Sequence, residues 1–382
     1  MEKEIKVLHI GIKEWPYSAG VKEGKNRGGG VGKYVEILFG SFPENIKLYV
    51  ITRKLKGQKK SEQENNIEIR RVNTLSGRKL RTVSLGFLSF FKALKIIKKE
   101  NIDIIHSHIF FNNIIAILLK AVTKKPVIVV PHSQMYHRFL LKSPSLRKKT
   151  ERYFEQKIYK YADKVVLFTQ QHVDTYIEIT KEKKINFAVV HTGMKIKALE
   201  APVFDFKKKI KILYVGRLQK GKAVDSSIKA ISLLNDEQKA QIEFNVVGEG
   251  DEKDNLTRQA KKLGLSSIVK FRGYQSNPSA YYENTDIFLL PTDTEGLSMA
   301  LLEAMMCWSA CIVNNWGVPF AKDTVYELKN NLPETIKTAL ALFISNKELI
   351  KKYAIRGRKE IERDFSGISF ANKYINLYKE LL

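Results

Sequence analysis

The sequence predicts an α/β protein built from two tandem, doubly wound domains, and three observations support this class. Short apolar runs recur along the chain with helix-like segments between most of them, as in parallel strands covered on both faces. The series of runs restarts near residue 210, and 382 residues suffice for two domains. Glycines and histidines follow several runs, where open parallel sheets bind their ligands.

The first series of runs predicts the strands of an N-terminal sheet. These runs are 5–12, 46–52, 67–72, 102–109, 126–133, 164–169 and 186–192. Segment 77–99 has seven basic residues, no acidic residue and an apolar side, which predicts the crossover helix before the run at 102–109. A second hypothesis adds a membrane-facing surface there, to which the basic segment 138–152 also belongs.

The second series predicts a C-terminal sheet of the same kind. Its runs are 210–217, 242–250, 267–274, 286–292 and 310–315. The connection between the two series is around 196–209 and contains Pro202. The two halves therefore form separate α/β units on the same plan.

Segment 285–307 combines a strand, a polar loop and an apolar helix with one charged residue, Glu303. Ser298 is the predicted N-cap of the helix. Glu295 precedes Glu303 by eight positions, about 12 Å along a helix, whereas a retaining hydrolytic pair needs roughly 5 Å. The two carboxylates suit opposite ends of a long ligand, with the helix N-terminus between them for phosphate or sugar. The alternative is a solvated loop glutamate and a buried salt bridge.

The net charge and the cysteine count indicate which partners and which cellular compartment the protein has. The net charge of +26 is uneven, with +21 in residues 1–200 and +5 in residues 201–382, which favours an anionic membrane or a polyanion as partner. The alternative is a lysine-rich proteome with solvated lysines, which accounts for much of the excess but less easily for the asymmetry. Two cysteines, Cys307 and Cys311, indicate neither a disulfide framework nor a metal site.

No apolar run is long enough for a transmembrane helix, and no signal peptide is evident, so a cytoplasmic location is expected.

Three near-matches to nucleotide-binding motifs fail. Residues 216–223 resemble a phosphate-binding P-loop, but Ala223 replaces the hydroxyl residue that binds magnesium. Residues 28–33 and 248–253 lack the last glycine of the dinucleotide motif G-x-G-x-x-G. No nucleic-acid-binding module is present, so no nucleic acid partner is expected.

Five motifs together resemble the GT-B-fold glycosyltransferases of family 4 over essentially the whole chain. They are EGLSMALLE at 295–303 (the E-x7-E motif), VGRLQKGKAVD at 215–225, VVGEG at 246–250, VKFRGY at 269–274 and GGGVGKYVEIL at 28–38. The resemblance implies two Rossmann-like domains facing across a cleft. Residues 1–195 would bind the acceptor and residues 210–363 the nucleotide sugar. Residues 364–382 would form a closing helix that packs back on the N-terminal domain.

The resemblance also implies roles for individual residues. Arg217 and Lys222 would neutralise the leaving diphosphate, Glu303 would hold the ribose, and Glu295 would hold the sugar. His132 would orient donor or acceptor hydroxyls. The catalytic set is His132, Glu295, Arg217 and Lys222. The wider ligand-binding set is Gly29, Gly30, His108, Gly216, Gly248, Tyr274, Gln275, Gly296, Leu297, Ser298 and Glu303.

The implied activity is retaining, metal-independent transfer from a UDP- or GDP-sugar to a glycan or lipid-linked acceptor, in cell-surface polysaccharide synthesis. The enzyme would be cytoplasmic or peripheral on the inner face of the cytoplasmic membrane. Two alternatives stay open: a catalytically decayed glycan-binding or scaffold relative, and a nucleotide-sugar epimerase of the same fold. Trp308 and segment 316–334 depart from the family pattern and motivate the first alternative.

Overall fold

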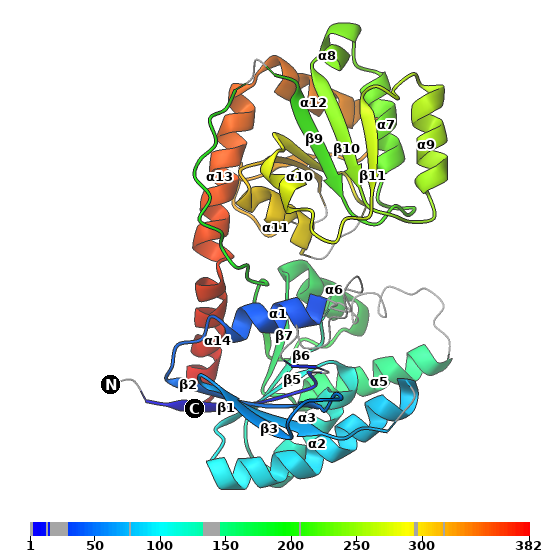
Figure 1. Cartoon of the computed structure of the whole chain (residues 1–382). Coiled ribbons are helices and arrows are strands. Elements are labelled where there is room, and N and C mark those ends of the chain that lie inside the picture. Colours follow the sequence, from blue (N-terminus) through cyan, green and yellow to red (C-terminus); the bar gives the residue numbers. More distant parts are fainter. Residues whose placement is uncertain are drawn as a thin grey trace. The chain divides into compact units, whose positions relative to one another are not determined.

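The structure is a computed structural model, and it describes residues 3–12, 14–15, 30–75, 78–132, 146–205, 208–293, 297–315 and 318–382. The chain divides into two compact units (Figure 1). Unit 1 contains Met1–Gly193 and Gly367–Leu382, and unit 2 contains Met194–Ser366. The C-terminal helix therefore belongs to the N-terminal unit. The binding roles predicted for the two domains stay predictions.

Unit 1 is built on an eight-stranded sheet in the order β3-β4-β2-β1-β5-β6-β7-β8. All neighbouring strands are parallel except the pair β3 and β4. The strands are β1 (Ile5–Ile10), β2 (Ile46–Arg53), β3 (Ser61–Glu64), β4 (Ile67–Val72), β5 (Ile104–His108), β6 (Val127–Val130), β7 (Lys164–Leu167) and β8 (Phe187–Val189).

Helices cover both faces of this sheet, as the apolar runs predict. The helices are α1 (Gly30–Phe39), α2 (Arg78–Glu100), α3 (Phe110–Thr123), α5 (Leu146–Tyr161), α6 (Gln170–Thr180) and α14 (Gly367–Leu381). One core lies under α1 and α14, and the other lies under α2, α3, α5 and α6 (Figure 1). Along β1, Val7 belongs to the first core and Leu8 to the second, because successive side chains of a strand point to opposite faces.

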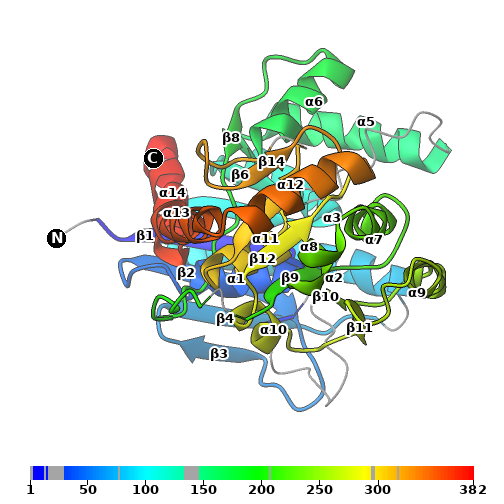
Figure 2. The ribbon, with the colours of Figure 1, turned by 90° about the horizontal axis from the view of Figure 1, so that it is seen from above.

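Unit 2 is built on a six-stranded, all-parallel sheet in the order β11-β10-β9-β12-β13-β14. Its strands are β9 (Ile210–Val215), β10 (Ile242–Val247), β11 (Val269–Gly273), β12 (Ile287–Leu290), β13 (Ala310–Asn314) and β14 (Tyr326–Leu328). Its helices are α7 (Val224–Ser232), α8 (Asp236–Ala240), α9 (Lys253–Lys262), α10 (Ser279–Glu283), α11 (Met299–Met306), α12 (Pro333–Ser345) and α13 (Glu348–Asp364). Helices α7 and α9 pack on one face and α10 and α11 on the other (Figures 1 and 2).

The predicted class of two doubly wound α/β domains is confirmed, and every predicted apolar run contains a strand. Two short strands have no counterpart in the prediction. All four residues of β3 are exposed and polar, so no hydrophobic signal marks that strand. Strand β14 has only three residues.

Two further expectations concern cysteines and membranes. Cys307 and Cys311 are both buried free thiols. Within the described ranges, none of the helices is both long enough and apolar enough to cross a lipid bilayer.

Candidate functional site

The sheet of unit 2 has its topological switch point between β9 and β12. The chain proceeds from β9 to β10 and β11 on one side, and from β12 to β13 and β14 on the other. In open parallel sheets of this kind, ligands bind beyond the carboxyl ends of the strands at the point where the order reverses. Gly216 and Arg217 directly follow β9, and Pro291 directly follows β12. The loop that contains Arg217 and Lys222 therefore begins at the switch point between β9 and β12.

Hydrogen bonds join the loop after β9 to the loop after β12. The carbonyl oxygen of Gly221 accepts from the backbone N–H of Asp293 at 2.9 Å and from Oγ1 of Thr292 at 3.1 Å. The Asn331 side-chain amide donates to Oδ1 of Asp293 at 2.6 Å and to the Pro291 carbonyl oxygen at 3.1 Å. Lys222 follows Gly221 directly, so its backbone is fixed beside the loop that leads to α11.

Close backbone packing joins the loops after β9 and β10. A Cβ atom added to Gly248 would lie 1.9 Å from the carbonyl oxygen of Gly216. Gly248 also has a φ of +143°, which side chains of L residues rarely adopt. The N–H of Gly216 donates to the Val247 carbonyl oxygen at 3.0 Å. Only glycine at position 248 lets the two strand ends approach this closely.

Helix α11 begins as the sequence predicts. The Ser298 side chain accepts a hydrogen bond from the Leu301 N–H at 3.3 Å, so the predicted N-cap is confirmed. Leu297 is half-buried and packs against the core of unit 2. The helix buries Leu301 and Met305 against the same core.

Glu303 lies on α11 and is half-buried, not fully buried. Its carboxylate lies near the buried hydroxyl of Tyr282, and burial together with this carboxylate raises the pKa of Tyr282. The chain itself therefore supplies this carboxylate with a neighbour. That neighbour is a phenol, which stays neutral at pH 7.

The remaining predicted residues of unit 2 are at the same edge of the sheet or outside the described residues. Arg217 is exposed, and Lys222 is partly exposed. Tyr274 follows β11 with 64% of its surface exposed, and the Gln275 side chain donates to the Arg272 carbonyl oxygen at 2.8 Å. Glu295 and Gly296 lie outside the described residues.

In unit 1, two predicted histidines form part of a larger cluster. His108 ends β5, and His132 follows β6 with a φ of +54°. Nδ1 of His108 and Nε2 of His132 are 3.3 Å apart, so the structure brings these predicted residues into contact. Gly30 begins α1 in the same unit, whereas Gly29 is not among the described residues.

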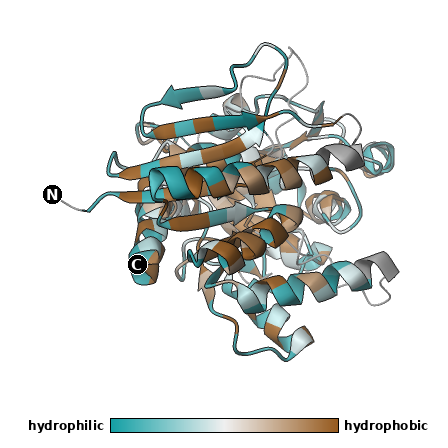
Figure 3. Ribbon diagram, turned by 90° about the horizontal axis from the view of Figure 1, so that it is seen from below, coloured by the Kyte–Doolittle hydropathy of each residue, from teal (hydrophilic) through white to brown (hydrophobic). Residues whose placement is uncertain are grey.

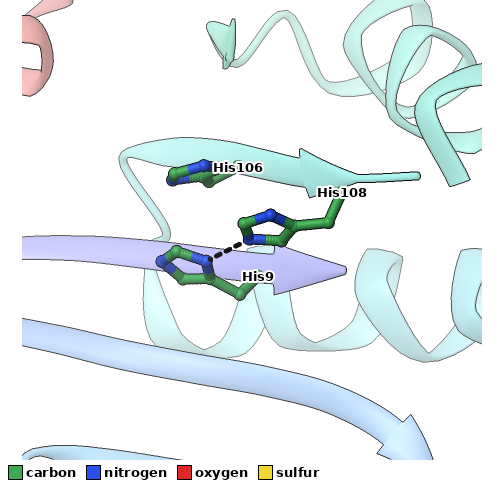
Figure 4. Close-up of side chains that lie close together, drawn as sticks. All are labelled: His9, His106 and His108. Carbon is green, nitrogen blue, oxygen red and sulfur yellow. Dashed lines mark hydrogen bonds between the residues drawn. The ribbon is translucent and has the colours of Figure 1, made fainter. Parts of the chain in front are cut away.

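Sequence reasoning missed two members of this cluster, His9 and His106. Nδ1 of His9 lies 3.2 Å from Nε2 of His108 (Figure 4), and Nδ1 of His106 lies 2.8 Å from the hydroxyl of Tyr378. His9 pairs with His106 in the register of β1 and β5. His106 and His108 share one face of β5 because they are two residues apart. This period of two in the run at 102–109 was the signal that could have found His106.

Burial controls the charge of the cluster. Burial, followed by the neighbouring imidazoles, holds the pKa values of His9, His106 and His108 well below their ordinary value. Burial lowers the pKa of His132 to about 3. All four imidazoles are therefore neutral at pH 7 and can act as hydrogen-bond partners or metal ligands.

The ring arrangement favours hydrogen bonding over metal binding. His9, His106 and His108 offer nitrogen atoms within 4.8 Å of one another, and imidazole suits zinc and other transition metals. However, the His106 ring stacks on His108, with centroids 4.6 Å apart and planes inclined by 23°, and it lies tilted over His9, with centroids 4.5 Å apart and planes inclined by 34°. Imidazole lone pairs lie in the ring plane. Rings that lie over one another therefore do not direct three lone pairs at one point.

Comparisons with known proteins agree with this architecture. A family model described as "Glycosyltransferase Family 4" matches residues 28–197, and one described as "Glycosyl transferases group 1" matches residues 196–360. Together the two models span most of the chain. The chain belongs to the GT-B glycosyltransferases. The predicted resemblance, of the family 4 type, is confirmed.

Individual relatives are distant but similar in length. An uncharacterized glycosyltransferase of Methanocaldococcus jannaschii is 26% identical over 89% of this chain and 91% of its own. A Campylobacter jejuni N-acetylgalactosaminyltransferase, named for a diphospho-undecaprenol-linked acceptor, is 24% identical over 78% of this chain and 80% of its own. The crystal structure of Anabaena HepE in complex with UDP matches with a TM-score of 0.72 at 14% identity, over 99% of this chain and 100% of HepE.

Proposed function

We propose that this glycosyltransferase is a metal-independent, retaining hexosyltransferase of family 4 that uses a nucleotide-diphosphate sugar. Its acceptor would be a glycan or lipid-linked saccharide in cell-surface polysaccharide synthesis. The relative from Campylobacter jejuni supports the acceptor class by its name, and HepE supports a uridine nucleotide by its bound UDP.

The observation that carries the donor proposal is the joining of the loops after β9 and β12 through Gly221, Thr292 and Asp293. It fixes the loop of Arg217 and Lys222 next to the loop that leads to the N-terminus of α11. A helix N-terminus has free N–H groups and a positive dipole, and both favour a diphosphate.

The proposed course uses these groups without a metal ion. Arg217 and Lys222 neutralise the charge that develops on the leaving diphosphate, and fixed cations perform this role without reorganising during the reaction. Glu303 accepts hydrogen bonds from the ribose hydroxyls, and Glu295 holds hydroxyls of the transferred sugar. The leaving phosphate oxygen helps to deprotonate the acceptor on the same face of the sugar, so the anomeric configuration is retained.

We further propose that one face of unit 1 binds an anionic membrane. Exposed apolar side chains gather on α2, α3 and α5, and these helices pack on the same core and so cover the same face of the sheet. Figure 3 shows hydrophobic and hydrophilic turns alternating along helices of the structure seen from below. The exposed apolar side chains are Val83, Phe87, Leu88, Phe91, Leu118, Val122, Tyr153, Phe154 and Tyr161. Exposed lysines lie among them, including Lys95, Lys98 and Lys99 on α2 and Lys157 on α5. Apolar insertion with lysines beside it is the pattern of membrane-surface helices.

A donor screen tests the proposed function. UDP-, GDP- and ADP-sugars are added singly, and the melting temperature is measured for the wild type, Glu303→Ala and the exposed control Glu237→Ala. A ligand that binds only the folded state at 100 times its Kd stabilises by about 2.7 kcal/mol, so one nucleotide class raises the melting temperature by several degrees. Glu237→Ala keeps this rise, and Glu303→Ala loses most of it. The absence of a rise with every nucleotide sugar would contradict the donor assignment.

A further inference from the structure

Three of the histidines in unit 1 form a line of hydrogen bonds from inside the sheet to its carboxyl edge. The His9 and His108 rings have nitrogens 3.2 Å apart, centroids 5.5 Å apart and planes inclined by 16° (Figure 4). The His108 and His132 rings have nitrogens 3.3 Å apart, centroids 5.5 Å apart and planes inclined by 31°. The rings therefore meet edge to edge, with the facing nitrogens directed at each other. The hydrogen bond to His9 is made by Nε2 of His108, and the hydrogen bond to His132 is made by its Nδ1.

Because each neutral ring has a single N–H, both hydrogen bonds must donate in the same direction along the line of three histidines. A neutral imidazole has one N–H donor and one nitrogen lone pair. If His108 accepts from His9 at Nε2, it must donate to His132 from Nδ1. In the opposite state, all three rings carry the proton on Nε2. The tautomer of His132 is therefore set by the tautomers of His108 and His9.

The inner end of the line favours one of the two states. Within the described part of the chain, Nε2 of His9 is buried without a hydrogen-bond partner. A buried N–H without an acceptor is rarer in proteins than an under-satisfied acceptor. The proton of His9 is then on Nδ1, where His108 accepts it. His106 repeats the pattern, because its Nε2 also lacks a partner and its Nδ1 lies against the Tyr378 hydroxyl.

We propose that His9 and His108 are positioning residues that hold His132 in the tautomer with the proton on Nδ1. His132 is 8% exposed, whereas His9 and His108 are fully buried, so the line reaches the surface only at His132. Because Nε2 of His132 accepts from His108, Nδ1 is the nitrogen that a ligand meets. His132 is then a hydrogen-bond donor to a sugar hydroxyl or phosphate oxygen and does not remove a proton. This inference rests on the proposed function and specifies how the site contacts its ligand.

A matched pair of substitutions at His108 tests the positioning role. In His108→Asn, the amide nitrogen takes the place of Nδ1 and keeps a donor toward His132, whereas His108→Leu has a similar size and no donor. Turnover per folded molecule falls by about tenfold in His108→Leu, the rate equivalent of one hydrogen bond, and by less than about threefold in His108→Asn. Equal losses in the two variants would overturn the proposal. The corresponding pair at His172, a buried histidine on α6, gives equal turnover in both variants.

The tautomers are measured independently of activity by long-range ¹H–¹⁵N NMR on histidine-labelled protein. The expected spectrum shows protonated Nδ1 and unprotonated Nε2 for His9, His108 and His132. Protonated Nε2 in His132 would overturn the proposal. In His108→Leu, His132 loses its preference for one tautomer. If the enzyme transfers sugar but His132 carries its proton on Nε2, only this inference is refuted. If the three histidines have the expected tautomers but no nucleotide sugar binds, only the proposed function is refuted.

Discussion

At the carboxyl edge of the sheet in unit 1 the predicted histidines are neutral and buried, whereas the edge in unit 2 has two cations that are at least partly exposed. The first edge has His108 and His132, whose pKa values burial keeps far below 7. The second edge has Arg217 and Lys222 on a loop fixed by backbone hydrogen bonds. Charge therefore lies where a diphosphate is proposed to bind. Neutral donors with fixed direction lie where hydroxyl groups need orientation.

Removing a cation from unit 2 has the largest expected effect. Arg217→Ala weakens binding of the nucleotide-sugar donor by about 10- to 100-fold, because a hydrogen bond to a charged group is worth about 1.5–3 kcal/mol. Arg258→Ala, an exposed arginine on α9, is the matched control and leaves the Kd unchanged. Isothermal titration calorimetry measures both. If Arg217→Ala and Arg258→Ala bind the nucleotide-sugar donor with equal affinity, the diphosphate does not bind at Arg217.

The histidines of unit 1 are expected to make stability depend on pH. Their folded pKa values lie below the unfolded value of about 6.5, so below pH 6.5 the unfolded chain binds more protons than the folded chain. The free energy of unfolding therefore decreases as the pH is lowered below 6.5, by up to about 1.4 kcal/mol per pH unit for each histidine. The facing phenols of Tyr34, Tyr374 and Tyr378 have raised pKa values and stay neutral throughout.

Urea unfolding at pH 7.5, 6.5 and 5.5 measures this dependence. His106→Gln removes one titrating group and lowers the slope below pH 6.5 by up to about 1.4 kcal/mol per pH unit. A free energy of unfolding that is the same at pH 5.5 and pH 7.5 would show that the cluster is charged in the folded protein.

The smallest expected effect concerns the surface of unit 1. Phe87→Glu on α2 lowers the fraction bound to anionic vesicles by severalfold, since it replaces an apolar ring that is 61% exposed with a charge that the surface repels by about 1 kcal/mol. Ile368→Glu is the control, because Ile368 is 69% exposed on α14, which packs on the opposite face of the sheet. Co-sedimentation with vesicles with and without phosphatidylserine gives both fractions. Wild-type protein absent from both pellets would remove the membrane proposal.

The sequence predicted the features that follow from local periodicity and from strand ends. The strands around His108 and Arg217 were visible as apolar runs, and Ser298 was visible as an N-cap before an apolar helix. His9 was not visible, because a histidine inside an apolar run gives no sign of which strand lies beside it. Only the pairing of β1 with β5 brings it to His106. Tyr282, the neighbour of Glu303, was missed for the same reason, since it lies on another helix.

Hydrogen–deuterium exchange with and without the nucleotide-sugar donor tests most directly where the donor binds. With the donor bound, exchange slows in peptides that contain residues 216–222, 248–250 and 297–303, which are the strand ends and the first turns of α11 in unit 2. Exchange stays unchanged in α9, which lies on one face of the same sheet. Protection that is confined to α9, or to segments of unit 1 alone, would contradict the assignment of the donor site to the switch point between β9 and β12.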